Sequence, residues 1–255
     1  MIRTENLKKS FGDNEVLKGI DMEFINGKTN LIIGRSGAGK TVLLKLLVGL
    51  HEPTSGTVFY DDINFFQLSR KDVRKLRMEV GMLFQGSALF DSMDVEENIR
   101  FPLDMFTSMT RKEKKDRVNK CLERVNLDGV NHQYPSEISG GMKKRVGIAR
   151  AIVLDPKYLF CDEPNSGLDP KTALVIDELI QDITRDNNIT TVINTHDMNS
   201  VMEIGENIAL LHHGNLVWRG NKDEVMASDN EILHDFIFAS PFLQRLRADA
   251  MEKQG

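Results

Sequence analysis

The stretch Gly34-Arg35-Ser36-Gly37-Ala38-Gly39-Lys40-Thr41 lies between an apolar run at 31–33 and a helical pattern over residues 40–48. It matches the pattern G-x-x-x-x-G-K-[ST] without a gap, and it has the preceding strand and following helix that this pattern requires. Glycines let backbone N–H groups approach a phosphate closely, and the new helix presents its positive N-terminal end to the same anion. The stretch therefore predicts a phosphate-binding loop in an α/β fold. We expect Lys40 to contact the β- and γ-phosphates of ATP, and the Thr41 hydroxyl to bind Mg²⁺.

The composition fits a globular protein with one large α/β domain, or with a core and a helical insertion. The chain has 255 residues, of which 40% are hydrophobic and 28% are charged. No apolar run reaches the ~18–20 residues that span a membrane, and the first residues lack the apolar region of a signal peptide. A formal charge of −5 argues against a general nucleic-acid binder. Cys121 and Cys161 show no metal-type spacing, so we expect a reducing compartment and a core role for Cys161.

The order of the secondary-structure patterns predicts a mostly parallel sheet core with an inserted helical lobe. Runs with strand character are 2–7, 16–24, 28–33, 56–60, 79–84, 158–161, 190–194, 208–212 and 216–219. Helical patterns fit 40–48, 70–76, 111–125, 140–154, 171–186 and 198–204, with one or two further helices after residue 220. The lobe should cover about 86–154, where strand signals are weak, and an antiparallel part should lie near the N-terminus.

We expect one domain over residues 1–240 and a C-terminal extension over 241–255. The apolar spacing at 236–246 fits a helix that packs either on its own chain or on a neighbouring copy.

Two acids follow an apolar strand pattern directly. Asp162 and Glu163 come after the run Tyr158-Leu159-Phe160-Cys161. Beside a phosphate loop, an acid at the first of these positions helps to hold Mg²⁺. The next acid can activate the attacking water as a general base. We therefore expect Asp162 in the metal site and Glu163 in catalysis.

The segment Ile138-Ser139-Gly140-Gly141-Met142 opens another helical pattern. Ser139 is a natural N-cap, and Gly140 and Gly141 leave backbone N–H groups exposed, so this helix start can bind an anion. The phosphate loop of the same chain already uses a different helix. We therefore expect this segment to face a nucleotide that is bound to a second chain. The basic run Lys143-Lys144-Arg145 fits either a solvated helix face or a contribution to γ-phosphate binding.

Two single residues at strand ends are predicted to sense the nucleotide. Gln85 follows the run 82–84, and its amide can contact Mg²⁺ and the attacking water. His196 follows the run 191–194, and its ring can donate to the γ-phosphate.

Further contacts are expected around the nucleotide. Phe11 lies before a strand and can stack on the adenine face, with little selectivity among bases. We also expect Val16 and Val42 to contact the nucleotide, and Asp169 to reach the partner chain.

In the order of these motifs, the chain resembles the ATP-binding cassette of ABC transporters over residues 1–220. The motifs are the phosphate loop, Gln85, 138–142, the acid pair, Ser166-Gly167-Leu168-Asp169 and His196. The resemblance implies a P-loop NTPase fold with a RecA-like, mostly parallel core. It also implies a head-to-tail homodimer with two ATP molecules, in which each phosphate loop faces Ser139–Gly141 of the other copy. Transmembrane permease subunits would receive the motion.

A narrower resemblance concerns the cargo. The stretch Phe84-Gln85-Gly86-Ser87-Ala88-Leu89-Phe90-Asp91-Ser92-Met93, its continuation to Leu103, and Met142 are similar to bacterial Mla/Mce-type lipid-transport ATPases. This resemblance implies phospholipid transport with an MCE-domain partner, at the cytoplasmic face of the inner membrane. The permease would dock on about 86–106, although the apolar residues there could instead be core: Leu89, Phe90, Met93, Leu103, Met105 and Phe106.

Three other functions compete with lipid transport. An amino acid or a lipoprotein could be the cargo of the same chemistry. A soluble ABC ATPase of DNA repair or translation is disfavoured, because the chain has one cassette and no long heptad run. An inactive scaffold is disfavoured by the intact Lys40, Asp162, Glu163 and His196.

Overall fold

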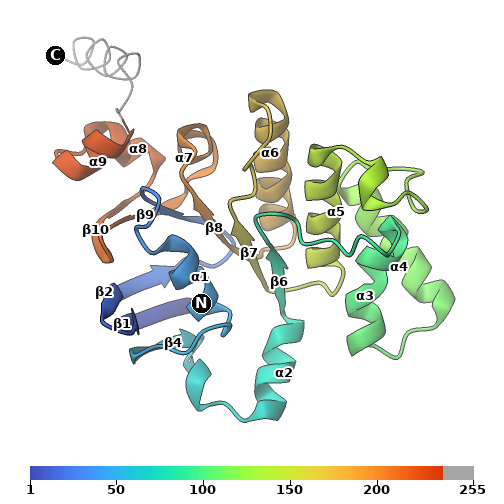
Figure 1. The fold of residues 1–255 in the computed structure, drawn as a ribbon, viewed down its shortest axis with the longest axis horizontal. Helices are drawn as coiled ribbons and strands as arrows, with labels where there is room; N and C mark the ends of the chain where they lie inside the picture. The colour runs from blue at the N-terminus through green and yellow to red at the C-terminus, as the bar shows by residue number, and fades with distance from the viewer. Residues whose placement is uncertain (238–255) are drawn as a thin grey trace.

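The computed structural model describes residues 1–237, which form two β-sheets with helices around them and a helical lobe on one side (Figure 1). One sheet has the strand order β2-β1-β4-β5, and the other has the order β10-β9-β3-β8-β7-β6. The molecule is therefore an α/β protein with mixed sheets, and the predicted fold class is confirmed.

The smaller sheet is the antiparallel part expected near the N-terminus. It consists of β1 (Ile2–Phe11), β2 (Asn14–Phe24), β4 (Ser55–Tyr60) and β5 (Ile63–Asn64). β1 pairs antiparallel with both β2 and β4, and β4 pairs antiparallel with β5.

The larger sheet carries the phosphate loop. Its strands are β3 (Thr29–Ile33), β6 (Val80–Leu83), β7 (Tyr158–Asp162), β8 (Thr190–Thr195), β9 (Asn207–His212) and β10 (Asn215–Gly220). All pairs are parallel except β9 with β10. Every residue of β3, β7 and β8 is buried, which explains the all-apolar runs 31–33 in β3 and 159–161 in β7. Because neighbouring strands are parallel, the carboxyl ends of β3, β6, β7 and β8 meet at one edge, where ligands of such sheets bind.

Helices cover the core sheet. They are α1 (Lys40–Leu47), the short η1 (Phe65–Gln67), α2 (Arg70–Met78), α6 (Pro170–Asp186), α7 (Met198–Ile204), α8 (Lys222–Ala227) and α9 (Glu231–Ile237). The last two are the helices expected after residue 220.

The lobe between β6 and β7 is helical throughout its secondary structure. It contains α3 (Val95–Phe106), α4 (Arg111–Arg124), η2 (Pro135–Glu137) and α5 (Gly140–Ile152). Capping boxes formed by Asp94 with Glu97 and by Thr110 with Glu113 start α3 and α4. The sequence pattern does not predict α3 as a separate helix. This helix has Pro102 in its interior, where proline is usually disfavoured.

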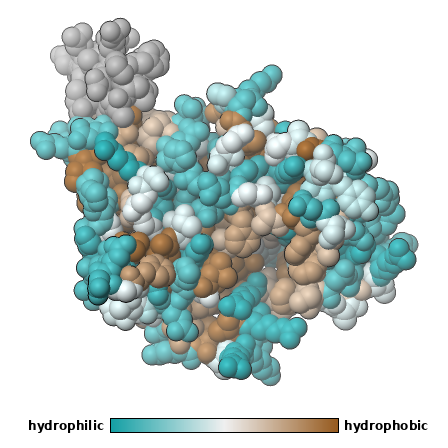
Figure 2. Space-filling model, in the orientation of Figure 1, coloured by the Kyte–Doolittle hydropathy of each residue, from teal (hydrophilic) through white to brown (hydrophobic). Residues whose placement is uncertain are grey.

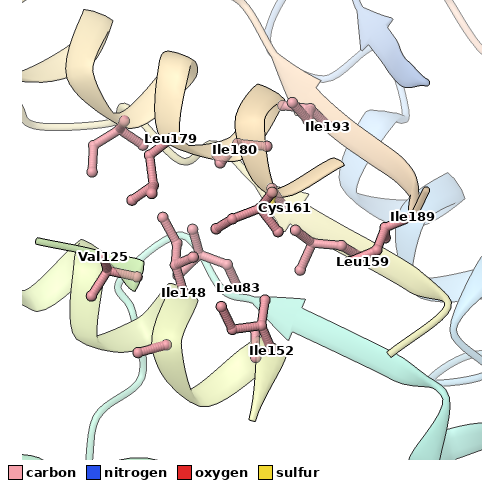
Figure 3. Packing of buried hydrophobic residues seen from close by; sticks show 14 of the residues in the cluster. Leu83, Val125, Ile148, Ile152, Leu159, Cys161, Leu179, Ile180, Ile189 and Ile193 are labelled. Carbon is pink, nitrogen blue, oxygen red and sulfur yellow. The ribbon is translucent and has the colours of Figure 1, made fainter. Parts of the chain in front are cut away.

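One hydrophobic cluster joins the lobe to the core sheet (Figure 3). Ile148 and Ile152 of α5 and Leu179 and Ile180 of α6 pack over Leu83, Leu159, Cys161 and Ile193 of the strands. Burial raises the pKa of the Cys161 thiol, which is fully buried and acts as the small core residue that its strand position predicts.

No helix among residues 1–237 is long and apolar enough to cross a membrane. The predicted extension over 241–255, and nearly all of the apolar spacing at 236–246, lie outside the described residues.

Candidate nucleotide-binding and hydrolysis site

The phosphate loop runs from the end of β3 into α1, as its sequence predicts. Gly34 and Gly39 have φ values of 149° and 105°, where side chains are disfavoured. A Cβ atom at Gly34 would lie 2.4 Å from the Leu211 carbonyl oxygen, and one at Gly39 would lie 2.7 Å from Leu17 Cδ2. The loop backbone therefore has little room for any residue but glycine at these two positions.

The loop lines a pocket of about 730 Å³. Its other lining residues are Val16, Val42, Gln85, Glu163, His196, Asp235 and Phe236. The pocket thus brings together the phosphate loop and predicted site residues from four other places in the sequence, Val16, Gln85, Glu163 and His196. A second cavity, of about 690 Å³, lies at the opposite ends of β7 and β8 and is lined by none of these residues.

Lys40 lines this pocket and is buried. Its Nζ donates to the carbonyl oxygens of Gly34 at 2.9 Å and Arg35 at 3.4 Å, and lies 3.7 Å from Glu163 Oε1. Burial lowers the pKa of the Lys40 amine, and the nearby acids oppose this shift. Glu163 Oε2 lies 2.7 Å from His196 Nδ1. Lys40 and His196 therefore hold the Glu163 carboxylate from two sides.

Thr41, Asp162 and Asn194 form a hydrogen-bonded group beneath the loop. Asn194 Nδ2 donates to Asp162 Oδ1 at 2.6 Å and to Thr41 Oγ1 at 3.3 Å, and Thr41 Oγ1 donates to Asp162 Oδ1 at 3.3 Å. Burial raises the pKa of the Asp162 carboxyl, and the hydrogen bonds from Thr41 and Asn194 act in the opposite direction. The sequence patterns did not identify Asn194, because it reads as one polar residue inside a buried strand.

The segment that begins α5 lies elsewhere on the molecule. Ser139 caps the helix by accepting from the Met142 N–H at 3.2 Å, and Ser139 and Gly140 are exposed. Asp169 is also exposed and caps α6, since it accepts from the N–H and hydroxyl of Thr172. Neither Asp169 nor Ser139–Gly141 is among the described residues that line the phosphate-loop pocket. Their exposure leaves them accessible to another chain.

Phe11 and Lys144, two nucleotide contacts that the sequence suggests, are not among the described residues that line the pocket. Phe11 does not line the described pocket; its ring is 45% exposed and packs edge-on against His51, with centroids 5.5 Å apart. Lys144 is only 5% exposed and donates to the backbone carbonyls of Gln85 and Glu163. For Lys144, the interpretation as part of a solvated helix face is therefore wrong, and its donors are directed to main-chain carbonyls.

A second buried polar group lies behind the acid pair. Asp177 of α6 accepts hydrogen bonds from Asn165 Nδ2 at 2.8 Å and from Ser200 Oγ at 2.7 Å. Burial raises the pKa of Asp177 to about 6. This group links the segment after Glu163 to α7, which follows His196, and no sequence pattern identified it.

Comparison with known proteins agrees with this geometry. The family model described as "ABC transporter" matches residues 17–166. The chain is 37% identical over 236 residues to a probable ribonucleotide transport ATP-binding protein mkl of Mycobacterium leprae, covering 92% of this chain and 68% of that protein. It is 39% identical over 259 residues to a methionine import ATP-binding protein MetN of Campylobacter jejuni, covering 95% and 77% respectively. The chain thus spans about two thirds of the length of mkl and three quarters of this MetN.

Solved structures show the same fold. A dimer of the ATP-binding cassette MJ0796 in a post-hydrolysis state with ADP and Pi has a TM-score of 0.79 at 30% identity, covering 87% of this chain and 99% of that chain. CbiO1 from Clostridium perfringens, part of the ABC transporter complex cbiONQ, has a TM-score of 0.82 at 31% identity, covering 96% and 97%.

Proposed function

The chain belongs to the ABC transporter family and is an ATPase, and from this we propose that its ATP hydrolysis powers lipid transport through a membrane permease. The proposed lipid is a phospholipid. In this proposal two copies pair head to tail and close on two ATP molecules. The observation that carries the hydrolytic part is the convergence of Lys40, Glu163, His196 and Gln85 on the phosphate-loop pocket.

In the proposed reaction, Glu163 is the general base that accepts a proton from the attacking water. Its carboxylate is directed into the pocket, with His196 at 2.7 Å and Lys40 at 3.7 Å. Lys40 would move its donors from the loop carbonyls to the β- and γ-phosphates of ATP. His196 is 64% exposed at its side chain, so its ring is accessible to the γ-phosphate and can donate a hydrogen bond there when ATP binds. Gln85 would orient the water from the opposite side.

The residues under the loop fit a Mg²⁺ ion. When bound to ATP, Mg²⁺ neutralises charge on the β- and γ-phosphates. This ion prefers oxygen ligands and is usually held by one or two carboxylates, water and phosphates. Thr41 and Gln85 line the phosphate-loop pocket, and Asp162, which does not line it, lies directly behind Thr41, with its Oδ1 3.3 Å from Thr41 Oγ1. Asn194 Oδ1 is buried without a hydrogen-bond partner among the described residues, which leaves an acceptor for a metal-bound water beside Asp162.

The proposed pairing of two copies is supported by the exposure of Ser139. The N-terminal end of α5 would serve as an anion site, and it does not line the phosphate-loop pocket of its own chain. In the proposed dimer, the exposed backbone N–H groups at the start of α5 would bind the γ-phosphate of the ATP held by the second copy. Asp169 would lie at the same interface. The MJ0796 cassette is itself dimeric, which supports the pairing of two copies.

The permease is proposed to dock between the lobe and the core. Phe84, Phe90 and Met105 are 37%, 41% and 54% exposed, whereas Leu103 of the same segment is 1% exposed. The expected docking segment is therefore divided between surface and core. Figure 2 shows brown and pale-brown apolar residues in the middle of one face, between the sheets and the lobe. Exposed apolar side chains of this kind suit a helix from a membrane protein.

The lipid cargo and the MCE-domain partner rest on the sequence of residues 84–103 and on Met142. In this proposal the chain lies at the cytoplasmic face of a bacterial inner membrane. The second candidate is import of a small polar molecule, favoured by the names of the methionine and ribonucleotide transport relatives. Both candidates use the same ATPase chemistry.

Affinity purification of the tagged chain from its native membranes, followed by mass spectrometry of proteins and lipids, separates the two candidates. A permease, an MCE-domain protein and enriched phospholipid would support lipid transport. A permease with a soluble binding protein and no enriched lipid would contradict it and support small-molecule import.

Two variants and a control test the docking surface in the same purification. Phe90→Asp and Met105→Asp should lose the permease but keep ATP binding. Ile63→Asp should keep the permease, because Ile63 is equally exposed, at 55%, but lies on the small sheet. Retention of the permease by both docking variants would contradict the proposed surface.

A further inference from the structure

Lys144 is a buried cation in the helix that begins at Ser139. It lies on α5, is 5% exposed, and burial lowers the pKa of its amine. Its Nζ donates to the carbonyl oxygen of Gln85, and to that of Glu163 at 3.3 Å. Burial of a cation is costly unless its donors are satisfied. Here the two acceptors that satisfy it are both main-chain atoms of residues that line the nucleotide pocket.

The two carbonyls leave neighbouring strands at the same edge of the sheet. β6 and β7 pair in parallel, with Leu83 opposite Cys161. Gln85 and Glu163 each follow those paired residues by two positions. Lys144 therefore bridges the two loops that carry the proposed water-orienting residue and the proposed general base.

The backbone of Glu163 depends on such support. Its φ of 49° is left-handed, a conformation that is uncommon for residues other than glycine. The Glu163 N–H donates to the Asn194 carbonyl at 3.0 Å, and its carbonyl accepts from the Ser166 N–H at 3.2 Å as well as from Lys144. The side chain leaves from the same Cα, so the orientation of this residue's backbone determines where its carboxylate meets His196.

The same helix also fixes the Gln85 loop further along. Arg150 of α5 donates to the carbonyls of Ser87 at 2.5 Å and Ala88 at 2.8 Å. Both acceptor residues have positive φ, at 61° and 47°. Residue 147 between the two cations is glycine, and a Cβ there would lie 2.7 Å from Leu83 Cδ1. The loop after β6 is thus bound closely to α5 through its backbone.

We propose that Lys144 is a positioning residue for ATP hydrolysis, which holds the backbone of Glu163 and Gln85 on the helix that carries Ser139. It acts through main-chain carbonyls and does not contact the nucleotide. The inference rests on the proposed role of Glu163 as general base. It predicts that loss of the Lys144 donors lowers the rate of the chemical step and leaves ATP binding nearly unchanged.

The first test is Lys144→Met, which keeps an unbranched side chain and a good helix former in the buried position but removes the donors. We expect kcat to fall by about 10–100-fold, which is part of the ~10²–10⁴-fold rate enhancement that a general base supplies. The affinity for ATP should stay within about threefold of the wild-type value. Lys144→Gln should recover part of the rate, because it retains an N–H donor. Lys115→Met is the control, since Lys115 is exposed on α4, and its rate should equal that of wild type.

A double-mutant cycle with Glu163→Gln distinguishes positioning from a general loss of structure. Because part of the effect runs through Glu163 and part through Gln85, Lys144→Met should lower single-turnover hydrolysis by a clearly smaller factor in the Glu163→Gln background than in wild type, at least about threefold smaller. A full, multiplying effect there, or a Lys144→Met rate within twofold of wild type, would overturn the proposal. Should Lys144→Met unfold, as its melting temperature would show, the same cycle and the same criteria apply to Lys144→Leu, which also removes the donors and is a good helix former. Normal turnover in Glu163→Gln alone would instead refute the general-base assignment, so the two failures are distinguishable.

Discussion

Replacing Asn194 with alanine tests the hydrogen-bond group that holds Asp162 in place. Asn194 is fully buried, and its Nδ2 donates to Asp162 at 2.6 Å and to Thr41 at 3.3 Å. The alanine variant leaves the Asp162 carboxylate without its closest donor, so its pKa, already raised by burial, should rise further. A proton then competes better with Mg²⁺ for this carboxylate, and the metal site weakens.

The size of the effect follows from two independent rules. A hydrogen bond to a charged group contributes about 1.5–3 kcal/mol. Loss of a residue that orients a metal ligand costs about 10–100-fold in metal affinity, or about 1.4–2.7 kcal/mol. Both rules give the same range. We therefore expect the Mg²⁺ concentration that half-saturates ATP hydrolysis to rise by about 10–100-fold in Asn194→Ala.

The assay is a Mg²⁺ titration of phosphate release at saturating ATP, with Thr190→Ala as the matched control. Thr190 lies on the same strand, is buried, and donates a side-chain hydrogen bond to Asn26 at 3.0 Å, far from Asp162. The control should lose some stability and keep its Mg²⁺ dependence. A half-saturating Mg²⁺ concentration in Asn194→Ala within twofold of wild type would refute the reasoning.

Three further substitutions have defined outcomes. Glu163→Gln should keep ATP binding and lower turnover by about 10²–10⁴-fold, the usual share of a general base; near-normal phosphate release would remove Glu163 from that role. Ser139→Arg should leave ATP binding to the separate chain intact but prevent two ATP-loaded copies from pairing, because a bulky cation would occupy the exposed start of α5. Loss of labelled-ATP binding by the isolated Ser139→Arg chain would contradict this assignment. Burial raises the pKa of Asp177 to about 6, so the stability linked to its protonation is complete below about pH 4 and is lost as the pH rises through 6. Relative to Asp177→Asn, wild type should therefore lose about 2 kcal/mol of unfolding free energy between pH 4 and pH 7. Urea unfolding at both pH values measures this, and an equal difference between the two proteins at each pH would refute it.

The fold could be predicted from the sequence where local chemistry determines local structure. The phosphate loop is contiguous, and the all-apolar runs 31–33 in β3 and 159–161 in β7 identify buried parallel strands. Once those strands are parallel neighbours, residues just after their ends must meet at one edge. For this reason Gln85, Glu163 and His196 could be placed in one site before any coordinates were known.

Other parts of the site depend on packing that a single stretch of sequence does not record. Lys144 lies between two other basic residues, and only the orientation of α5 against β6 and β7 decides that it points inward. Asn194 and Asp177 are polar residues whose partners lie 32 and 12 positions away or more. The segment 86–106 alternates between core and surface, because α3 packs only one face against the lobe.

The most direct test of the central claim uses two inactive variants in one complex. Lys40→Ala disables the phosphate loop, and Ser139→Arg disables the start of α5. The two chains, with different tags, are co-expressed and purified in tandem, so that each complex contains one of each. If each site combines the phosphate loop of one copy with Ser139 of the other, the mixed pair contains one intact site and regains ATP hydrolysis that neither variant shows alone. Mixed pairs as inactive as their parents would contradict a hydrolytic site shared between two copies.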